Sequence, residues 1–202
     1  LFRSHAPDLM QYPPEHSIPA ENAWRIGSGE ERFRSTGESL LSWTAQRAAG
    51  LELEEVTPAA APGYTGVSFD AEGAPIAPNK AQSEQRYDAG GTPFVAPGMT
   101  LKLRGRVGGM RADAELRVIS VTEEPRHIGF VLGTMGGSVV SGEEAFDVDW
   151  NEDTDEVWFT VRAFDAPASM LYRTVPALIK RRRRELFARY LRAISPMYAT
   201  PH

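Results

Sequence analysis

Residues 127–150 read HIGFVLGTMGGSVVSGEEAFDVDW, and this stretch decides the fold class. Two runs of alternating apolar residues flank a Gly-rich loop, which is the pattern of a β-hairpin with a long tip. In the second run Glu144 shares a strand face with three large apolar side chains, whereas Glu143 points the other way. The two adjacent glutamates therefore diverge and cannot form a catalytic carboxylate pair.

The composition narrows the class of protein. The 202 residues carry a net charge of −5 and include no Cys. This length suits one domain with a substantial core, and the lack of Cys excludes disulfides, thiol catalysis and thiolate metal sites. No run approaches the roughly 20 apolar residues that span a bilayer, and no secretory signal precedes the first elements. We therefore expect a soluble, cytoplasmic protein without membrane insertion.

Alternating hydrophobicity continues on both sides of the opening stretch. It predicts five consecutive strands with short connections, which is typical of an antiparallel meander. The predicted strands span residues 99–107, 114–122, 127–134, 143–150 and 156–164.

A helical segment is expected earlier in the chain. Ser28 followed by Glu31 has the spacing of a capping box, and Gly50 is a typical helix stop. Gly37 favours a division of the helix into two pieces. Its buried side is expected to contain Phe33, Leu40, Leu41 and Trp43, and the residues expected to form a strand after it are Leu51, Leu53 and Val56.

Apolar residues recur at helical spacing from residue 174 to residue 194 and predict a long closing helix. Arg182 interrupts this stripe, four residues after Leu178 and four before Leu186. A curved antiparallel sheet followed by such a helix indicates an α+β helix-grip fold, in which the sheet wraps around the C-terminal helix and a cavity lies between them. The full stripe is Val175, Leu178, Ile179, Leu186, Phe187, Tyr190, Leu191 and Ile194.

The remaining segments frame this single domain. Residues 1–22 contain four prolines and no periodic pattern, so we expect an extended N-terminal arm. The helix-grip domain is predicted over residues 23–195, with a Pro/Gly-rich insert at about 57–98. Residues 196–202 are expected to form a tail.

Two ordered blocks resemble the signature of an uncharacterised family of plants and bacteria, a "domain of unknown function". The first runs from Ile26-Gly27-Ser28-Gly29 to Ala49-Gly50, and the second from Gly129-Phe130 through Gly142-Glu143-Glu144 to Phe146. The resemblance covers residues 24–194. It implies a START-like, polyketide-cyclase-like helix-grip fold with an apolar ligand pocket, and it implies no activity. Ser138 stands where this family would have a histidine. Any chemistry that the histidine performs in relatives therefore cannot occur in this chain.

Glu144 and Arg182 are candidate site residues, because each is a charge on an otherwise apolar face. A buried charge costs several kcal/mol unless it is paired, so two opposite charges that face one interior predict each other. Three placements remain open: a sheet edge where Arg182 reaches water, a buried structural pair, or a pair that orients a ligand. Aromatic residues at core spacing are more often core, and those that could line a ligand pocket are Phe130, Phe146, Trp158 and Tyr190.

Three functions are compatible with these patterns. The leading hypothesis is that a small apolar or amphipathic molecule binds in the cavity, with no cofactor, metal-ligand set or catalytic group identified. The second is a cavity enzyme of hydrolase or cyclase type that uses Glu144 as a general acid or base. The third is a scaffold that uses the basic run 180–184 on an acidic partner. Nucleic acid is disfavoured, because a helix scatters five consecutive basic residues around its axis and residues 143–156 are strongly acidic.

Overall fold

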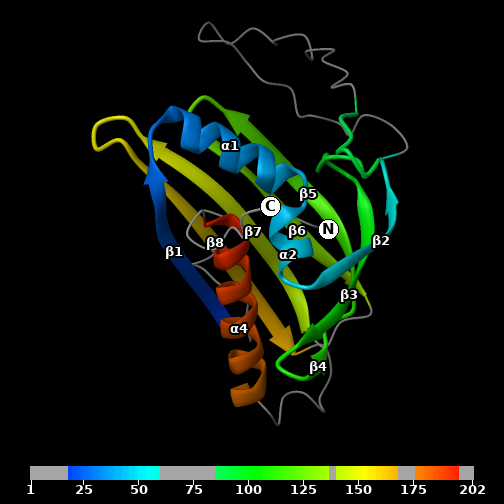
Figure 1. The fold of residues 1–202 in the computed structure, drawn as a ribbon. Coiled ribbons are helices and arrows are strands. Elements are labelled where there is room, and N and C mark those ends of the chain that lie inside the picture. The colour runs from blue at the N-terminus through cyan, green and yellow to red at the C-terminus, as the bar shows by residue number, and fades with distance from the viewer. Residues whose placement is uncertain (1–17, 60–84, 137–139, 168–175, 196–202) are drawn as a thin grey trace, which may run out of the picture.

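The computed structural model describes residues 18–59, 85–136, 140–167 and 176–195. In chain order its elements are β1 (Ile18–Ser28), α1 (Glu30–Leu41), α2 (Thr44–Ala48), β2 (Leu51–Thr57), β3 (Thr100–Val107), β4 (Met110–Arg111), β5 (Ala114–Glu124), β6 (His127–Gly136), β7 (Val140–Asn151), β8 (Glu156–Pro167) and α4 (Pro176–Ile194). The strands form one antiparallel sheet in the order β1-β8-β7-β6-β5-β3-β2, with β4 paired to β3. The sheet curves around α4, and all three helices lie on its concave side (Figure 1).

The five-strand meander and the closing helix are confirmed. The strands β3, β5, β6, β7 and β8 begin and end within three residues of the predicted bounds. Each pairs antiparallel with the next in that series. The α+β helix-grip architecture follows, because the helix that ends the chain's described part packs into the bend of this sheet.

Strand β1 corrects the predicted N-terminal arm. Residues 18–22 belong to this strand and pair with β8, from Ile18 opposite Asp165 to Asn22 opposite Val161. Ala20, Trp24 and Ile26 alternate with polar residues, but Pro19 and Asn22 weaken this signal, and the pairing partner lies far along the chain. Ser138, residues 60–84 of the predicted insert and the tail at 196–202 lie outside the described residues.

The helical segment forms and ends before Gly50 (φ 80°) as predicted, but its predicted start and its predicted break are wrong. Ser28 is the last residue of β1, and the N-cap of α1 is Gly29, at φ 88° and without a side-chain capping bond. The Gly29 amide instead donates to the Asp155 carbonyl at 3.0 Å. The helix continues through Gly37, and the break comes at Trp43, whose φ of 65° separates α1 from α2. The Trp43 indole donates to the Pro93 carbonyl at 2.9 Å and fixes this corner.

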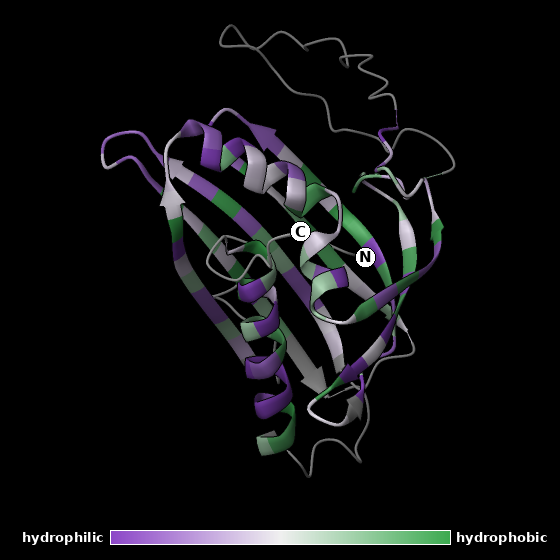
Figure 2. Cartoon of the chain, in the orientation of Figure 1, coloured by the Kyte–Doolittle hydropathy of each residue, from purple (hydrophilic) through white to green (hydrophobic). Residues whose placement is uncertain are grey.

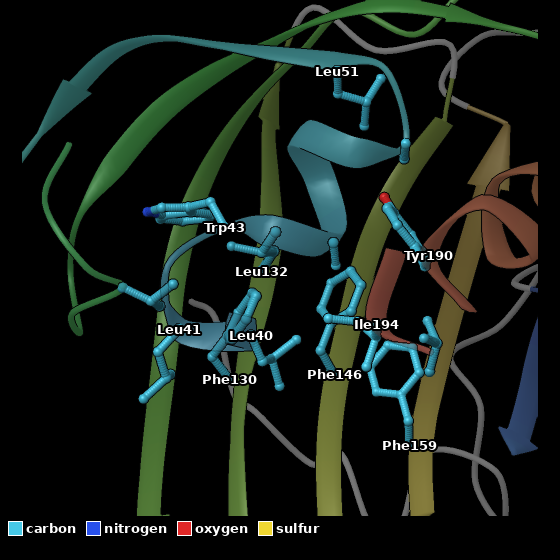
Figure 3. Close-up of a cluster of buried hydrophobic side chains, with 14 of the residues drawn as sticks. Leu40, Leu41, Trp43, Leu51, Phe130, Leu132, Phe146, Phe159, Tyr190 and Ile194 are labelled. Atoms are coloured by element: carbon cyan, nitrogen blue, oxygen red, sulfur yellow. The ribbon is translucent and has the colours of Figure 1, made fainter. Parts of the chain in front are cut away.

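The core lies between the helices and the concave face of the sheet. Strand register brings Phe130 of β6, Phe146 of β7 and Val161 of β8 into one row that faces the helices. Phe130 and Phe146 stack at 5.0 Å, and Trp43 packs edge-on against Phe130 at 5.7 Å. Figure 3 shows these rings between the sheet and the helical residues Leu40 and Leu41. Hydropathy alternates along the central strands in the same way (Figure 2).

Candidate functional site

A pocket of about 100 Å³ lies between α4, the middle strands and the β2–β3 edge of the sheet. Its polar groups are those of Thr134, Glu143, Glu144, Arg182, Arg183 and Tyr190. The pocket combines a mainly apolar wall with a few convergent polar groups, which is the usual composition of a small-molecule site. The apolar wall includes Leu51, Leu103, Ala112, Ala114, Leu116, Leu132, Ala163, Ile179 and Leu186.

Glu144 and Tyr190 meet inside this pocket. Strand register places Glu144 between Leu132 and Ala163 on the concave face, and the Tyr190 hydroxyl donates to the Glu144 carboxylate at 3.3 Å. Burial raises the pKa of Tyr190 well above its usual value, the charge and hydrogen bond of Glu144 raise it further, and Arg182 opposes them. Tyr190 is therefore protonated at neutral pH and acts as a hydrogen-bond donor.

Arg182 is a buried charge that lines the same pocket. Only 9% of the residue is exposed, and its Nε is buried without a hydrogen-bond partner among the described residues. An unsatisfied buried donor costs about 1–3 kcal/mol, and more for a charged group. The structure thus brings Arg182, Glu144 and Tyr190 to one pocket, with hydrogen-bonding capacity of Arg182 unused.

The helix presents a slightly different stripe from the predicted one. Leu178 is 41% exposed, whereas Arg183 is buried and lines the pocket beside Arg182. The inward residues follow the spacing i, i+3, i+4, i+7 and i+11 from Ile179, so Arg183 could have been identified by shifting the stripe by one residue. A stripe drawn through Leu178 places Arg183 outside the inward face of the helix, whereas a stripe drawn through Ile179 includes it.

The other predicted wall residues lie elsewhere. Phe130 and Phe146 are fully buried core residues below the pocket; the Phe146 ring packs edge-on against Tyr190 at 5.0 Å. Trp158 is on the opposite, convex face, where it is 36% exposed and its indole donates to Glu156 at 3.2 Å. The prediction that Trp158 lines the cavity is wrong, because the inward residues of β8 are its neighbours Val157 and Phe159.

A second polar cluster occupies the convex face. His127 Nδ1 lies 2.7 Å from the Asp149 carboxylate, and its Nε2 lies 3.5 Å from Asp147. The Arg162 guanidinium donates to Asp147 at 2.6 Å. The hydrogen bond with Asp149 raises the pKa of His127, and burial raises the pKa of Asp147 despite the charge of Arg162. The pocket that contains Glu144 has none of these four residues among its described lining residues, so we interpret the cluster as structural.

The basic run of α4 is divided by the helix into two environments. Lys180, Arg181 and Arg184 are exposed, whereas Arg182 and Arg183 are buried. Figure 2 shows the hydrophilic bands along this helix. The five residues therefore do not form one phosphate-binding stripe.

Two further findings concern metals and membranes. In the described ranges, no group of three or more His, Cys, Asp or Glu side chains could hold a metal ion. None of the helices in those ranges is both long enough and apolar enough to cross a bilayer.

Solved structures share the fold of this chain. A hypothetical protein of Helicobacter pylori, jhp0584, matches with a TM-score of 0.54 at 8% identity, over 93% of this chain and 92% of that one. Major latex-like protein 151 of Panax ginseng matches with a TM-score of 0.52 at 11% identity, over 92% and 99%. The Zhui aromatase/cyclase of Streptomyces sp. R1128 matches with a TM-score of 0.52 at 9% identity, over 89% and 92%. At such identities the similarity shows the fold alone.

Family membership rests on the sequence itself. The comparison with curated proteins found no match. The profile of the domain of unknown function DUF1990 matches residues 5–85 and 80–193, which is most of the chain. These ranges include the N-terminal block, the β6–β7 hairpin and α4. The helix-grip arrangement described above is therefore the fold of a chain that belongs to the DUF1990 family.

Proposed function

We propose that this protein binds a small amphipathic molecule in the pocket between α4 and the concave face of the sheet. The observation that carries the proposal is the convergence of Arg182, Glu144 and Tyr190 on an otherwise apolar cavity. Buried polar groups of this kind fix the orientation of a ligand, while the apolar wall supplies most of the contact area.

The size of the pocket limits the ligand. Drug-sized sites measure roughly 300–1,000 Å³, whereas an apolar cavity of about 150 Å³ accommodates benzene. The pocket of about 100 Å³ is smaller than this benzene cavity, so a molecule with one ring, such as benzyl alcohol, needs a small displacement of the surrounding side chains. A larger ligand requires movement of α4 relative to the sheet.

Titration with benzyl alcohol, followed by protein NMR chemical shifts, tests the proposal. We expect saturable shifts of Leu132, Ala163 and Leu186 methyl groups, which line the pocket. Ala163→Leu adds bulk to the wall and should weaken binding at least tenfold. Ala48→Leu makes the same change at an exposed position of α2 and should leave binding unchanged. Equal binding by both variants, or no saturable shift, would refute the proposal.

A cavity enzyme is the second candidate, and the hydrogen bond between Tyr190 and Glu144 favours it. A carboxylate and a phenol that are hydrogen-bonded to each other can act as general acid and general base toward a bound substrate. Small hydrophobic esters and cyclic ketones are suitable substrates for a turnover screen. Activity that is lost in Glu144→Gln would support this candidate, and activity that survives the change would exclude Glu144 as the acid or base.

A further inference from the structure

We infer that the ligand of this pocket carries a carboxylate, and that Arg182 binds it. The inference rests on the proposed function and specifies the chemical class of the ligand. Its starting point is the buried guanidinium of Arg182, whose Nε lines up with no acceptor among the described residues although the residue is 9% exposed.

The neighbouring carboxylates do not satisfy this donor. Glu144 lies in the pocket and accepts from the Tyr190 hydroxyl. Glu143 also lines the pocket, but its Oε2 is buried without a hydrogen-bond partner among the described residues, so this oxygen does not accept from the Arg182 Nε. Burial raises the pKa of Glu143, which disfavours its charged form.

The geometry of the Arg182 guanidinium, and not the charge of the wall, favours a carboxylate. The charged residues that line the pocket are two arginines, Arg182 and Arg183, and two glutamates, Glu143 and Glu144. A guanidinium presents parallel N–H groups that match the two oxygens of a carboxylate. A ligand carboxylate at Arg182 would supply the missing acceptor, and its apolar part would contact Ile179 and Leu186 one turn away on the same helix face.

Three probes with the same ring separate this inference from simple cavity binding. Benzoate is an anion at pH 7, benzyl alcohol is neutral and benzylamine is a cation. Calorimetric titration of the whole chain should give an affinity for benzoate at least tenfold higher than for benzyl alcohol, with benzylamine the weakest. Benzylamine as the tightest ligand would overturn the inference and would assign recognition to Glu144.

Variants of two neighbouring arginines identify the residue responsible. Arg182→Met removes the donor but keeps an unbranched side chain, and it should abolish the preference for benzoate while benzyl alcohol still binds. Arg182→Lys should restore part of the preference. Arg181→Met alters an exposed residue of the same helix and should change neither affinity.

The two proposals fail in different ways. If benzyl alcohol and benzoate bind equally and Arg182→Met has no effect, the carboxylate inference is wrong and the binding pocket stands. If none of the three probes binds, the proposed function itself is wrong.

Discussion

Gly129 of β6 lies directly against β7, close to the backbone of Phe146 and the side chain of Asp147. A Cβ built at this position would be 2.6 Å from the Phe146 carbonyl oxygen and would also meet the Asp147 carboxylate. Backbone cannot move aside as a flexible side chain can, so the substitution forces the two central strands apart.

We therefore expect Gly129→Ala to lower the free energy of unfolding by about 1–3 kcal/mol, the usual cost of overpacking. Gly136→Ala is the matched control on the same strand, because its Cβ would have only an ordinary contact at 3.6 Å with Glu115. Urea denaturation monitored by circular dichroism measures both variants. Equal midpoints for the two would show that β6 and β7 can separate without cost.

His127 makes stability depend on pH. The hydrogen bond with Asp149, followed by the charges of Asp149, Asp147 and Glu124, raises its pKa in the folded state, against a smaller opposing effect of burial. Because the pKa is raised in the folded state, protonated His127 stabilises that state. This stabilisation is complete below the unfolded pKa of about 6.5 and is lost as the pH rises through the folded pKa.

Wild type should therefore exceed His127→Gln in stability by more at pH 6 than at pH 9. Asp149→Asn, which removes the largest cause of the shift, should reduce the difference between the two pH values. Denaturant titrations at both pH values provide the measurement. A stability gap that is the same at pH 6 and pH 9 would contradict this assignment.

At the residue level, sequence patterns located the pocket charges more reliably than its aromatic wall. Glu144 and Arg182 stood out because a charge on an apolar face breaks a regular period, and both line the pocket. Trp158 was misplaced although Val157 and Phe159 beside it indicate the inward face of β8. The position of Trp158 in the alternation of β8 indicates which face it lies on, and the size of its side chain does not.

Helix α4 is attached to its neighbours by Arg189 as well as by apolar packing. The Arg189 Nη1 donates to the Ala49 carbonyl after α2 at 3.0 Å and to the Arg106 carbonyl in β3 at 2.9 Å. Both carbonyls lie at element ends or edges, where a charged side-chain donor supplies a partner that regular secondary structure lacks. One guanidinium thus connects three elements.

Arg189→Met should lower the free energy of unfolding by about 1–2 kcal/mol, since hydrogen bonds to charged groups contribute about 1.5–3 kcal/mol and this side chain is partly exposed. Arg192→Met, at an exposed position of the last turn, should change it by less than about 0.5 kcal/mol. Thermal denaturation of the two variants side by side gives the comparison. A loss in Arg192→Met as large as that in Arg189→Met would mean that general charge, and not the Arg189 contacts, holds the helix.

The elements differed in how far local signals defined them. The strands from β5 to β8 alternate clearly and were predicted within three residues. The start of α1 was misread because Ser28 pairs with Glu156 in the sheet and is not available as a cap. A capping box is a local signal, and here a long-range strand pairing overrides it.

At the scale of the whole molecule, β1 closes one side of the sheet. It pairs with β8 along almost the full length of both strands. Sequence periodicity indicates this strand only weakly, because Pro19 and Asn22 interrupt the alternation, and it cannot identify a pairing partner in a distant part of the chain. The helix-grip class was predictable without β1, since the meander and α4 define it.

A chain that begins at residue 23, the predicted domain start, should be less stable than one that begins at residue 18. The shorter chain leaves the β8 segment from Val161 to Asp165 without its partner, and an uncovered strand edge promotes association. We expect a lower denaturation midpoint and concentration-dependent light scattering for the shorter chain. Identical behaviour of the two would place the first essential residue after Asn22.

The corner at Trp43 also has a spectroscopic consequence. This indole is the fully buried one, while Trp24 and Trp150 are half-buried and Trp158 is partly in contact with water. Excitation of the protein should therefore yield an emission spectrum whose blue edge comes mainly from Trp43 and resists aqueous quenchers. The same ring contacts both Pro93 and Phe130. The blue edge of the emission spectrum therefore reports whether the corner between α1 and α2 remains packed against the sheet.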